Sequence, residues 1–135
     1  MSERMISMRI KWWMIVMAVV LLFPLSIGFS VWQGIREIQQ MEVYDVSMAE
    51  IADGTYTGRQ DTTGIKVEVS VDVSDGRIAA IDILEHENGR GSDAEVIVDD
   101  VIAAQSLSVD SISGATLSST VILKAVEEAL LQTSN

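Results

Sequence analysis

The sequence contains no cysteine, only one histidine and only one proline among its 135 residues. Without cysteine the chain has no disulfide, and neither an iron–sulfur cluster held by thiolates nor a thiolate zinc site is possible. The single histidine, His86, leaves no set of histidine ligands for a transition metal. Any redox chemistry must therefore come from a cofactor that is held in some other way, and no metal site is expected.

Basic residues are also scarce. Residues 34–135 hold 19 acidic and 6 basic residues, which gives them a net charge of −13. A surface this acidic argues against binding to nucleic acid and against lying flat on anionic lipid, and it favours solubility and basic partners. The acidic pairs Asp99-Asp100 and Glu127-Glu128 are interpreted as solvated helix faces.

One long run lacks charge altogether. Residues 12–32 read WWMIVMAVVLLFPLSIGFSVW, with tryptophan at both ends, where aromatic rings prefer the level of the lipid headgroups. At the helical rise of about 1.5 Å per residue the run is about 31 Å long, which matches the hydrocarbon core of a bilayer. We therefore predict a transmembrane anchor over residues 12–33, preceded by a cytoplasmic N-terminus over residues 1–11.

The charges that flank this run predict its orientation. Arg4, Arg9 and Lys11 precede it, whereas acidic residues dominate the other side, and positively charged flanks stay in the cytoplasm. The chain is thus expected to be a single-pass protein of the cell membrane with its C-terminal domain outside the cytoplasm. A cleaved signal peptide is the alternative, with Ser26-Ile27-Gly28 as its best cleavage site, although the residues beyond that site are still apolar.

Patterning beyond the span predicts a helical stalk and then a compact α+β domain. Residues 34–52 contain no helix breaker and carry apolar residues at helical spacing, so they predict the stalk. Residues 53–135 are predicted to fold as a small antiparallel sheet with packed helices.

The strands of this domain follow from two-residue alternation and turn signals, and its helices follow from longer spacing. The third strand carries apolar residues on both faces, which predicts a central position in the sheet. Asp75-Gly76 is the expected hairpin turn, and Ser92 the expected N-cap of a capping box. The predicted strands cover residues 54–58, 65–74 and 77–85, and the predicted helices cover residues 92–107 and 117–132.

The residues from Asp110 to Thr116 deliver a hydroxyl to the start of the last predicted helix. Gly114 allows a positive φ and the close approach of another group, and Ala115 leaves room beside it. Thr116 lies where main-chain N–H groups and the positive end of the helix dipole favour a phosphate. Spacing alone favours a simpler interpretation, in which Ser113 or Thr116 only caps the helix.

The run SGATLSS, residues 113–119, with Asp110 three residues before its first serine, resembles the attachment motif of the FMN-binding domain family. The same motif occurs in the flavin-carrying subunits of the sodium-translocating quinone reductase and of the related ferredoxin-linked electron-transport complex. In that family the threonine of the Gly-Ala-Thr step is esterified to the phosphate of FMN. The resemblance covers roughly residues 53–131 and implies Thr116 as the attachment residue, within a cofactor-binding motif made of Asp110, Ser113, Gly114, Ala115, Leu117 and Ser118.

A second similarity lies after the third predicted strand, where such domains often carry His-x-Glu-Thr followed by proline and glycines. Residues 86–91 read HENGRG, so the histidine and the glycines match, whereas Asn88 and Gly89 depart from the usual threonine and proline. The resemblance implies that His86, Asn88 and Gly89 contact the flavin and that Arg90 pairs with its phosphate or with the reduced ring. The alternatives are a surface histidine at a strand end and a solvated arginine.

The resemblance also implies a function, that of an electron carrier whose FMN is donated from FAD by a separate Mg²⁺-dependent flavin transferase outside the cytoplasm. The expected partners are membrane lipid around the span, that transferase, and redox donor and acceptor proteins or a quinone-linked complex. With no second cofactor site and too little mass for a substrate pocket, the chain is interpreted as a carrier rather than an enzyme. Two alternatives stay open: a flavin-dependent reductase (or a subunit of one) that acts on a small molecule, and a non-redox anchored interaction module.

Overall fold

The computed structural model describes residues 2–87 and 91–132, and the chain divides into two compact units, Met1–Gln33 and Gly34–Asn135. The first unit belongs to one long helix, α1 (Ser2–Gln39), which continues through Pro24. Its stretch Arg9–Gln39 is long and apolar enough to cross a membrane, and its most apolar window has no buried residue. This agrees with the predicted N-terminal span.

The second unit is built on a three-stranded antiparallel sheet in the order β1 (Gly54–Thr62), β2 (Ile65–Ser74) and β3 (Arg77–Glu87). The alternation along β2 buries its apolar residues on one face and leaves the polar residues between them half exposed. Asp75 and Gly76 have φ values of 53° and 67°, as a type I′ hairpin turn requires. The predicted α+β class, second strand and hairpin are therefore confirmed.

Strand β3 differs from its prediction in position. The prediction of a central strand is wrong, because β3 lies at the edge of the sheet and β2 is central. Two register shifts each place an extra residue in β3 opposite β2. Each bulge changes which residues of β3 face inward, and this explains the apolar residues on both of its faces. The residues that share the side of the β2 valines are Ile78, Ile81, Ile83 and His86.

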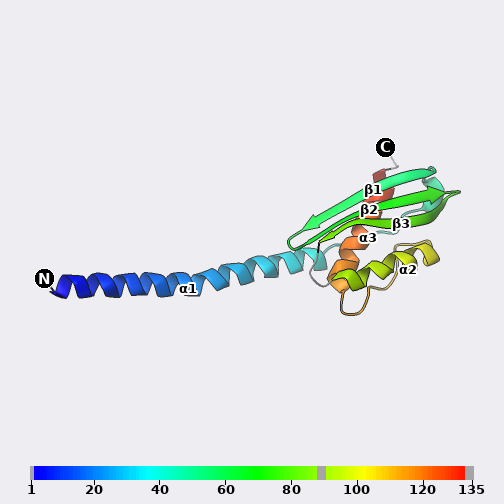
Figure 1. Cartoon of the computed structure of the whole chain (residues 1–135). Coiled ribbons are helices and arrows are strands. Elements are labelled where there is room, and N and C mark those ends of the chain that lie inside the picture. The colour runs from blue at the N-terminus through cyan, green and yellow to red at the C-terminus, as the bar shows by residue number, and fades with distance from the viewer. Residues whose placement is uncertain (1, 88–90, 133–135) are drawn as a thin grey trace. The chain divides into compact units, whose positions relative to one another are not determined.

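Helices cover one face of the sheet. Figure 1 shows α3 (Thr116–Leu131) crossing the strands, where it packs on β1 and β2, while α2 (Ile97–Ala104) packs on β3. The 3₁₀ helix η2 (Gly91–Val96) precedes α2. The predicted capping box is wrong, because α2 begins only at Ile97 and has Val96, without a side-chain cap, in the N-cap position.

Strand β1 passes through Gly58, where the sequence predicts the end of a strand. A Cβ on Gly58 would overlap the carbonyl oxygen of Ala125 and would lie 2.6 Å from the main-chain nitrogen of Ala129. A glycine inside a strand often marks the close approach of another backbone. Helix α3 therefore rests directly on the main chain of β1 at this point, and the strand continues beneath it.

The predicted helical stalk is wrong beyond Gln39, where α1 ends. Residues 41–47 have no regular secondary structure, and the 3₁₀ helix η1 (Met48–Glu50) follows them. Their apolar side chains pack against the core of the second unit, which offers them more burial than an isolated helix could. The segment between α1 and β1 is thus part of the domain.

Part of this attachment is an ion pair in the interior. Glu127 is 3% exposed, and the Lys124 ammonium lies 3.0 and 2.9 Å from its two carboxylate oxygens. The Tyr44 N–H donates to the same carboxylate at 3.2 Å, and Lys124 also donates to the Glu42 carbonyl at 3.0 Å. The interpretation of Glu127 as a solvated residue is wrong, because its charge is buried and paired.

Side chains form hydrogen bonds with main-chain groups on both edge strands of the sheet. Gln105, which follows α2 with a φ of 53°, accepts a hydrogen bond from the Ile78 N–H at 2.8 Å and donates one to the Ile78 carbonyl at 2.9 Å. On the opposite edge, the Arg59 N–H donates to the Glu128 carboxylate at 3.3 Å. These bonds use groups that an added strand would otherwise pair with.

Candidate functional site

The segment 105–115 connects α2 to α3 and ends in a tight turn. The Ala115 N–H donates to the Ile112 carbonyl at 3.0 Å, which closes a turn of four residues. Gly114, at the third position, has a φ of 81°, which is typical of a type II turn and favours glycine there. A Cβ on Gly114 would meet no atom of the described residues within 4 Å, so open space adjoins the turn.

Thr116 is the first residue of α3, and its side chain is exposed. Ala115 holds the N-cap position and makes no side-chain cap. Neither Ser113 nor Thr116 caps the first turn among the described residues, so the simpler interpretation of the motif as a capped helix finds no support. The Thr116 hydroxyl, which has no partner within the same residues, lies at the end of a helix whose dipole attracts negative charge.

Ser119 lies on the buried side of the turn and forms hydrogen bonds with its first and last residues. Its side chain is fully buried, and its hydroxyl accepts a hydrogen bond from the Ile112 N–H at 3.0 Å and donates one to the Ala115 carbonyl at 2.9 Å. These bonds join the first and last residues of the turn to α3. Sequence reasoning included Ser119 in the SGATLSS run but gave it no role, although serine bonded to the carbonyl four residues earlier is a recurrent pattern in helices.

The other predicted residues of the motif divide between surface and interior. Asp110, Ser113 and Gly114 are exposed, where another protein can reach them. Ala115 and Ser118 are buried, and Leu117 packs partly against the core. The motif therefore presents one polar outer side around Thr116 and fixes its inner side in the domain.

His86 lies near the end of β3, opposite Val67, and so faces the helix-covered side of the sheet. Its side chain is 4% exposed, and its Nδ1 lies 2.9 Å from a carboxylate oxygen of Glu95. The interpretation as a surface histidine is therefore wrong. Its Nε2 is buried without a hydrogen-bond partner among the described residues, a position that an ordered water or a ligand atom would fill.

The 3₁₀ helix η2 links the His86–Glu95 pair to α3. Glu95 belongs to η2, and η2 packs against both β3 and α3. Asn88, Gly89 and Arg90, which the sequence predicts to contact the cofactor, lie outside the described residues.

Asp45, in the segment between α1 and β1, holds the beginning of the segment 105–115 by hydrogen bonds. Asp45 accepts hydrogen bonds from the Leu107 N–H at 3.0 Å and from the Ser106 hydroxyl at 2.7 Å. These bonds, with that of Leu107 as the larger cause, hold the pKa of the Asp45 carboxyl below its usual value. Leu107 is itself buried. The segment 105–115 is therefore held near its beginning by Asp45 and at its end by Ser119.

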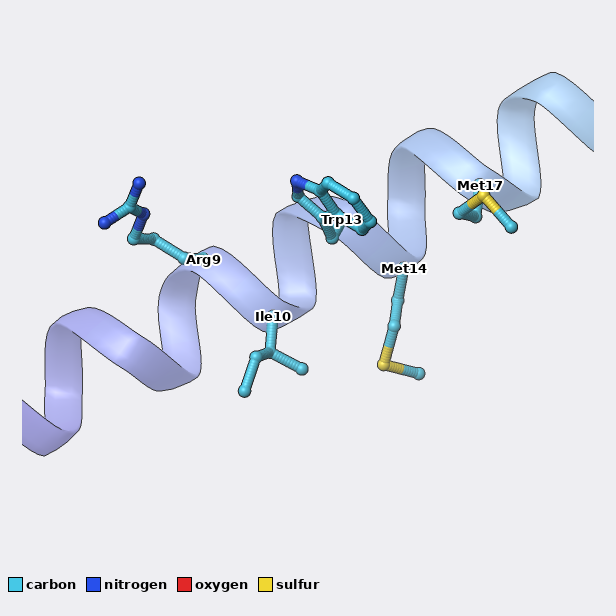
Figure 2. A pocket seen from close by; sticks show the side chains of 5 residues that line it. All are labelled: Arg9, Ile10, Trp13, Met14 and Met17. Atoms are coloured by element: carbon cyan, nitrogen blue, oxygen red, sulfur yellow. The ribbon is translucent and has the colours of Figure 1, made fainter.

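Metal-binding groups or pockets in the other described parts of the chain could form a second site. Residues 2–87 and 91–132 contain no group of three or more acidic or histidine side chains that could hold a metal. A pocket lies on α1, and Figure 2 shows that its lining side chains all come from that one helix: Arg9, Ile10, Trp13, Met14 and Met17. A pocket on a single exposed apolar helix suits lipid acyl chains better than an enclosed ligand.

The geometry around Thr116 fits a cofactor that carries a phosphate. The exposed hydroxyl can form an ester, and the N-terminal turn of α3 can receive phosphate oxygens. The space beside Gly114 leaves room for the phosphate to approach.

Known proteins show similarity over this same region. A family model, FMN-binding domain, matches residues 62–131, which is just over half of the chain and includes β2, β3 and α3. An uncharacterized protein of Treponema pallidum (strain Nichols) is 34% identical over 89 residues, which cover 64% of this chain and 25% of that protein. The chain thus spans about a quarter of the length of that relative.

Proposed function

The chain belongs to the FMN-binding domain family, and we propose that it carries FMN as a phosphoester on Thr116 and transfers electrons with it outside the cytoplasm. Family membership supports FMN as the cofactor and a flavin-binding role in electron transfer. The observation that carries the proposed attachment is the exposed Thr116 hydroxyl at a helix start, directly after Gly114 with its φ of 81°.

In the proposed attachment the Thr116 oxygen attacks the phosphorus in the FMN half of FAD. A bond forms between Oγ1 and that phosphorus, the pyrophosphate bond breaks, AMP leaves with the bridging oxygen, and the hydroxyl proton passes to a base. The described residues contain no cluster of side chains suited to Mg²⁺. Since phosphoryl chemistry of this kind usually requires Mg²⁺, we assign it to a separate flavin transferase.

Each residue of the site then has a distinct part. Thr116 holds the phosphate by an ester, and the first turn of α3 stabilises its negative charge. Gly114, which has no Cβ, leaves space for the phosphate to approach Thr116. His86, oriented by Glu95, bonds the cofactor through Nε2, and Asn88 and Gly89 are proposed as further contacts. When bound, FMN supplies the electron transfer itself.

The apolar helix supports a single-pass anchor in the cell membrane. Arg4, Arg9 and Lys11 before the span favour a cytoplasmic N-terminus, which supports a flavin domain outside the cytoplasm. A covalent bond suits that location, because a loosely held cofactor would diffuse away. The proposed redox partners are a donor and an acceptor protein or a quinone-linked complex.

The test is the intact mass of the chain purified from membranes. We expect an added mass of FMN less one water, together with flavin fluorescence that survives denaturing electrophoresis. Thr116→Ala should lose both signals and stay folded, because the side chain is exposed. Thr120→Ala is the matched control, since Thr120 lies one turn further along α3. Covalent flavin on the Thr116→Ala chain would show that the attachment residue is wrong.

The donor enzyme is tested separately by expression in a host without a flavin transferase. The chain should then be folded and colourless, and addition of a transferase with FAD and Mg²⁺ should label it. Full labelling of the purified chain by FAD and Mg²⁺ alone would contradict the need for a second protein.

A further inference from the structure

Ser119 is a polar residue in a place where packing alone favours alanine. Its side chain is fully buried within α3, and alanine has the higher helix propensity. A buried hydroxyl is costly unless it is hydrogen-bonded. The bond from Ser119 to the Ala115 carbonyl alone would satisfy its proton. The second bond, accepted from the Ile112 N–H, reaches outside the helix to the far end of the turn.

The two bonds of Ser119 leave the turn little freedom. Ile112 and Ala115 are already joined by their own main-chain bond at 3.0 Å, and Ser119 ties both of them to α3. Thr116 follows Ala115 directly, so the position of its hydroxyl depends on this arrangement. A reaction that joins two bound groups is sensitive to displacements of about 1 Å, which can cost on the order of a hundredfold in rate.

We propose that Ser119 is a positioning residue for flavin attachment, which fixes the turn so that the Thr116 hydroxyl meets the phosphorus of FAD in the transferase. The inference rests on the proposed attachment at Thr116. Ser119 itself touches neither reacting atom, because its hydroxyl is buried and bonded to the main chain of the turn. The bonds made and broken are those of the attachment step, with AMP as the leaving group.

Thr120 provides a matched control within the same helix. Its hydroxyl donates to the carbonyl four residues earlier, that of Thr116, at 3.0 Å. Ser119 makes the equivalent bond to Ala115 at 2.9 Å, but Ser119 also bonds Ile112, and Thr120 does not. The two alanine variants therefore remove similar hydroxyls, and only one of them releases the turn.

The experiment uses the full chain, purified in detergent without flavin from a host that lacks the transferase. Labelling by a flavin transferase with FAD and Mg²⁺ is followed by in-gel fluorescence, and kcat and the KM for FAD are measured. We expect Ser119→Ala to lower kcat at least about tenfold. The KM for FAD should be unchanged, because FAD binds to the transferase. Thr120→Ala should label at the rate of the unaltered chain.

Structural readouts separate positioning from loss of fold. Both variants should stay folded and melt within about 8 °C of the unaltered chain. Amide hydrogen exchange at Ile112 should become faster in Ser119→Ala alone, because only that variant removes the acceptor of its N–H. If Ser119→Ala does not fold, Ser119→Cys, of similar size and with weaker hydrogen bonds, replaces it and should also label slowly.

The outcomes are distinguishable. A folded Ser119 variant that labels as fast as Thr120→Ala overturns the positioning role while attachment at Thr116 stands. An unaltered chain that never acquires covalent flavin overturns the proposed attachment, and the positioning role with it. Slow labelling of Ser119→Ala with unchanged KM and an intact fold supports the inference.

Discussion

Replacing Gly58 by alanine tests how α3 is seated on the sheet. The added Cβ would lie 2.6 Å from the Ala129 nitrogen and closer still to the Ala125 carbonyl oxygen. Ordinary van der Waals contact begins near 3.4 Å, so α3 would have to move by about 0.8 Å at Ala129 and by more at Ala125. Both obstacles are main-chain atoms of a helix, and neither can rotate away as a side chain does.

Overpacking of this kind costs about 1–3 kcal/mol, and a clash with two main-chain atoms belongs at the upper end, about 3 kcal/mol. For a domain of roughly 100 residues each kcal/mol lowers the melting temperature by about 4–8 °C, so Gly58→Ala should lower it by about 12–24 °C. The assay is thermal unfolding of the flavin-free full chain in detergent, followed by circular dichroism.

The control for this experiment is Gly114→Ala, which enters open space but must adopt a φ of 81°. Its cost is on the order of 1 kcal/mol from backbone strain alone. If Gly58→Ala melts at or above the temperature of Gly114→Ala, the argument from close helix–strand contact is refuted.

Three further predictions concern the segment 105–115 and the anchor. Gly114→Val should nearly eliminate flavin attachment, while the flavin-free chain stays folded and melts at least about 4–8 °C lower because valine is strained at a φ of 81°. In-gel fluorescence beside a melting curve decides, and normal labelling would show that Gly114 is an ordinary turn residue. Because the pKa of Asp45 is lower in the folded chain than in the unfolded one, its contribution to stability is complete above about pH 4 and is lost as the pH falls through the folded pKa. Asp45→Asn should therefore destabilise the domain at pH 7 and flatten the acid limb of its stability curve, and an unchanged acid limb would contradict this assignment. Protease added to protoplasts or outer-permeabilised cells should digest residues 53–135, and complete protection would reverse the proposed orientation.

The features that sequence reasoning predicted well are those that local chemistry dictates. The alternation of Val67, Val69 and Val71 can satisfy only a strand with one buried face, and β2 has the predicted bounds. Asp75-Gly76 selects its hairpin because both positions need positive φ. Helix α3 begins one residue before its predicted start, at Thr116, because the turn at Gly114 delivers the chain directly into it.

The features that sequence reasoning missed depend on contacts between distant segments. Gly58 looks like a turn residue until α3 is placed on it, and the segment around Tyr44 looks helical until Glu127 and Lys124 bind it. The burial of His86 could not be foreseen, because the bulges in β3 decide which side of the sheet it faces. The local sequence pattern of β3 does not predict these bulges.

The residues of the candidate site also differ in how far the sequence predicts their roles. Thr116 and Gly114 could be singled out only through the resemblance of SGATLSS to the attachment motif, because spacing alone favours a simple helix cap. Ser119 could not, because its importance comes from a bond to Ile112 that forms only when the turn folds back. Asp45 lies 62 positions before Leu107 in the chain, and no local pattern links them.

The side chains that bind Ile78 and Arg59 on the two edge strands bear on whether copies of the protein associate through the sheet. If the apolar helix anchors the protein in a membrane, as proposed, copies of it move in two dimensions and meet far more often than the same number dispersed in solution. An open strand edge would turn such encounters into sheet continuation from one copy to the next. Gln105 already occupies both main-chain groups of Ile78, and Glu128 occupies the Arg59 N–H. We expect these occupied groups to disfavour pairing of the two edge strands with strands of other copies.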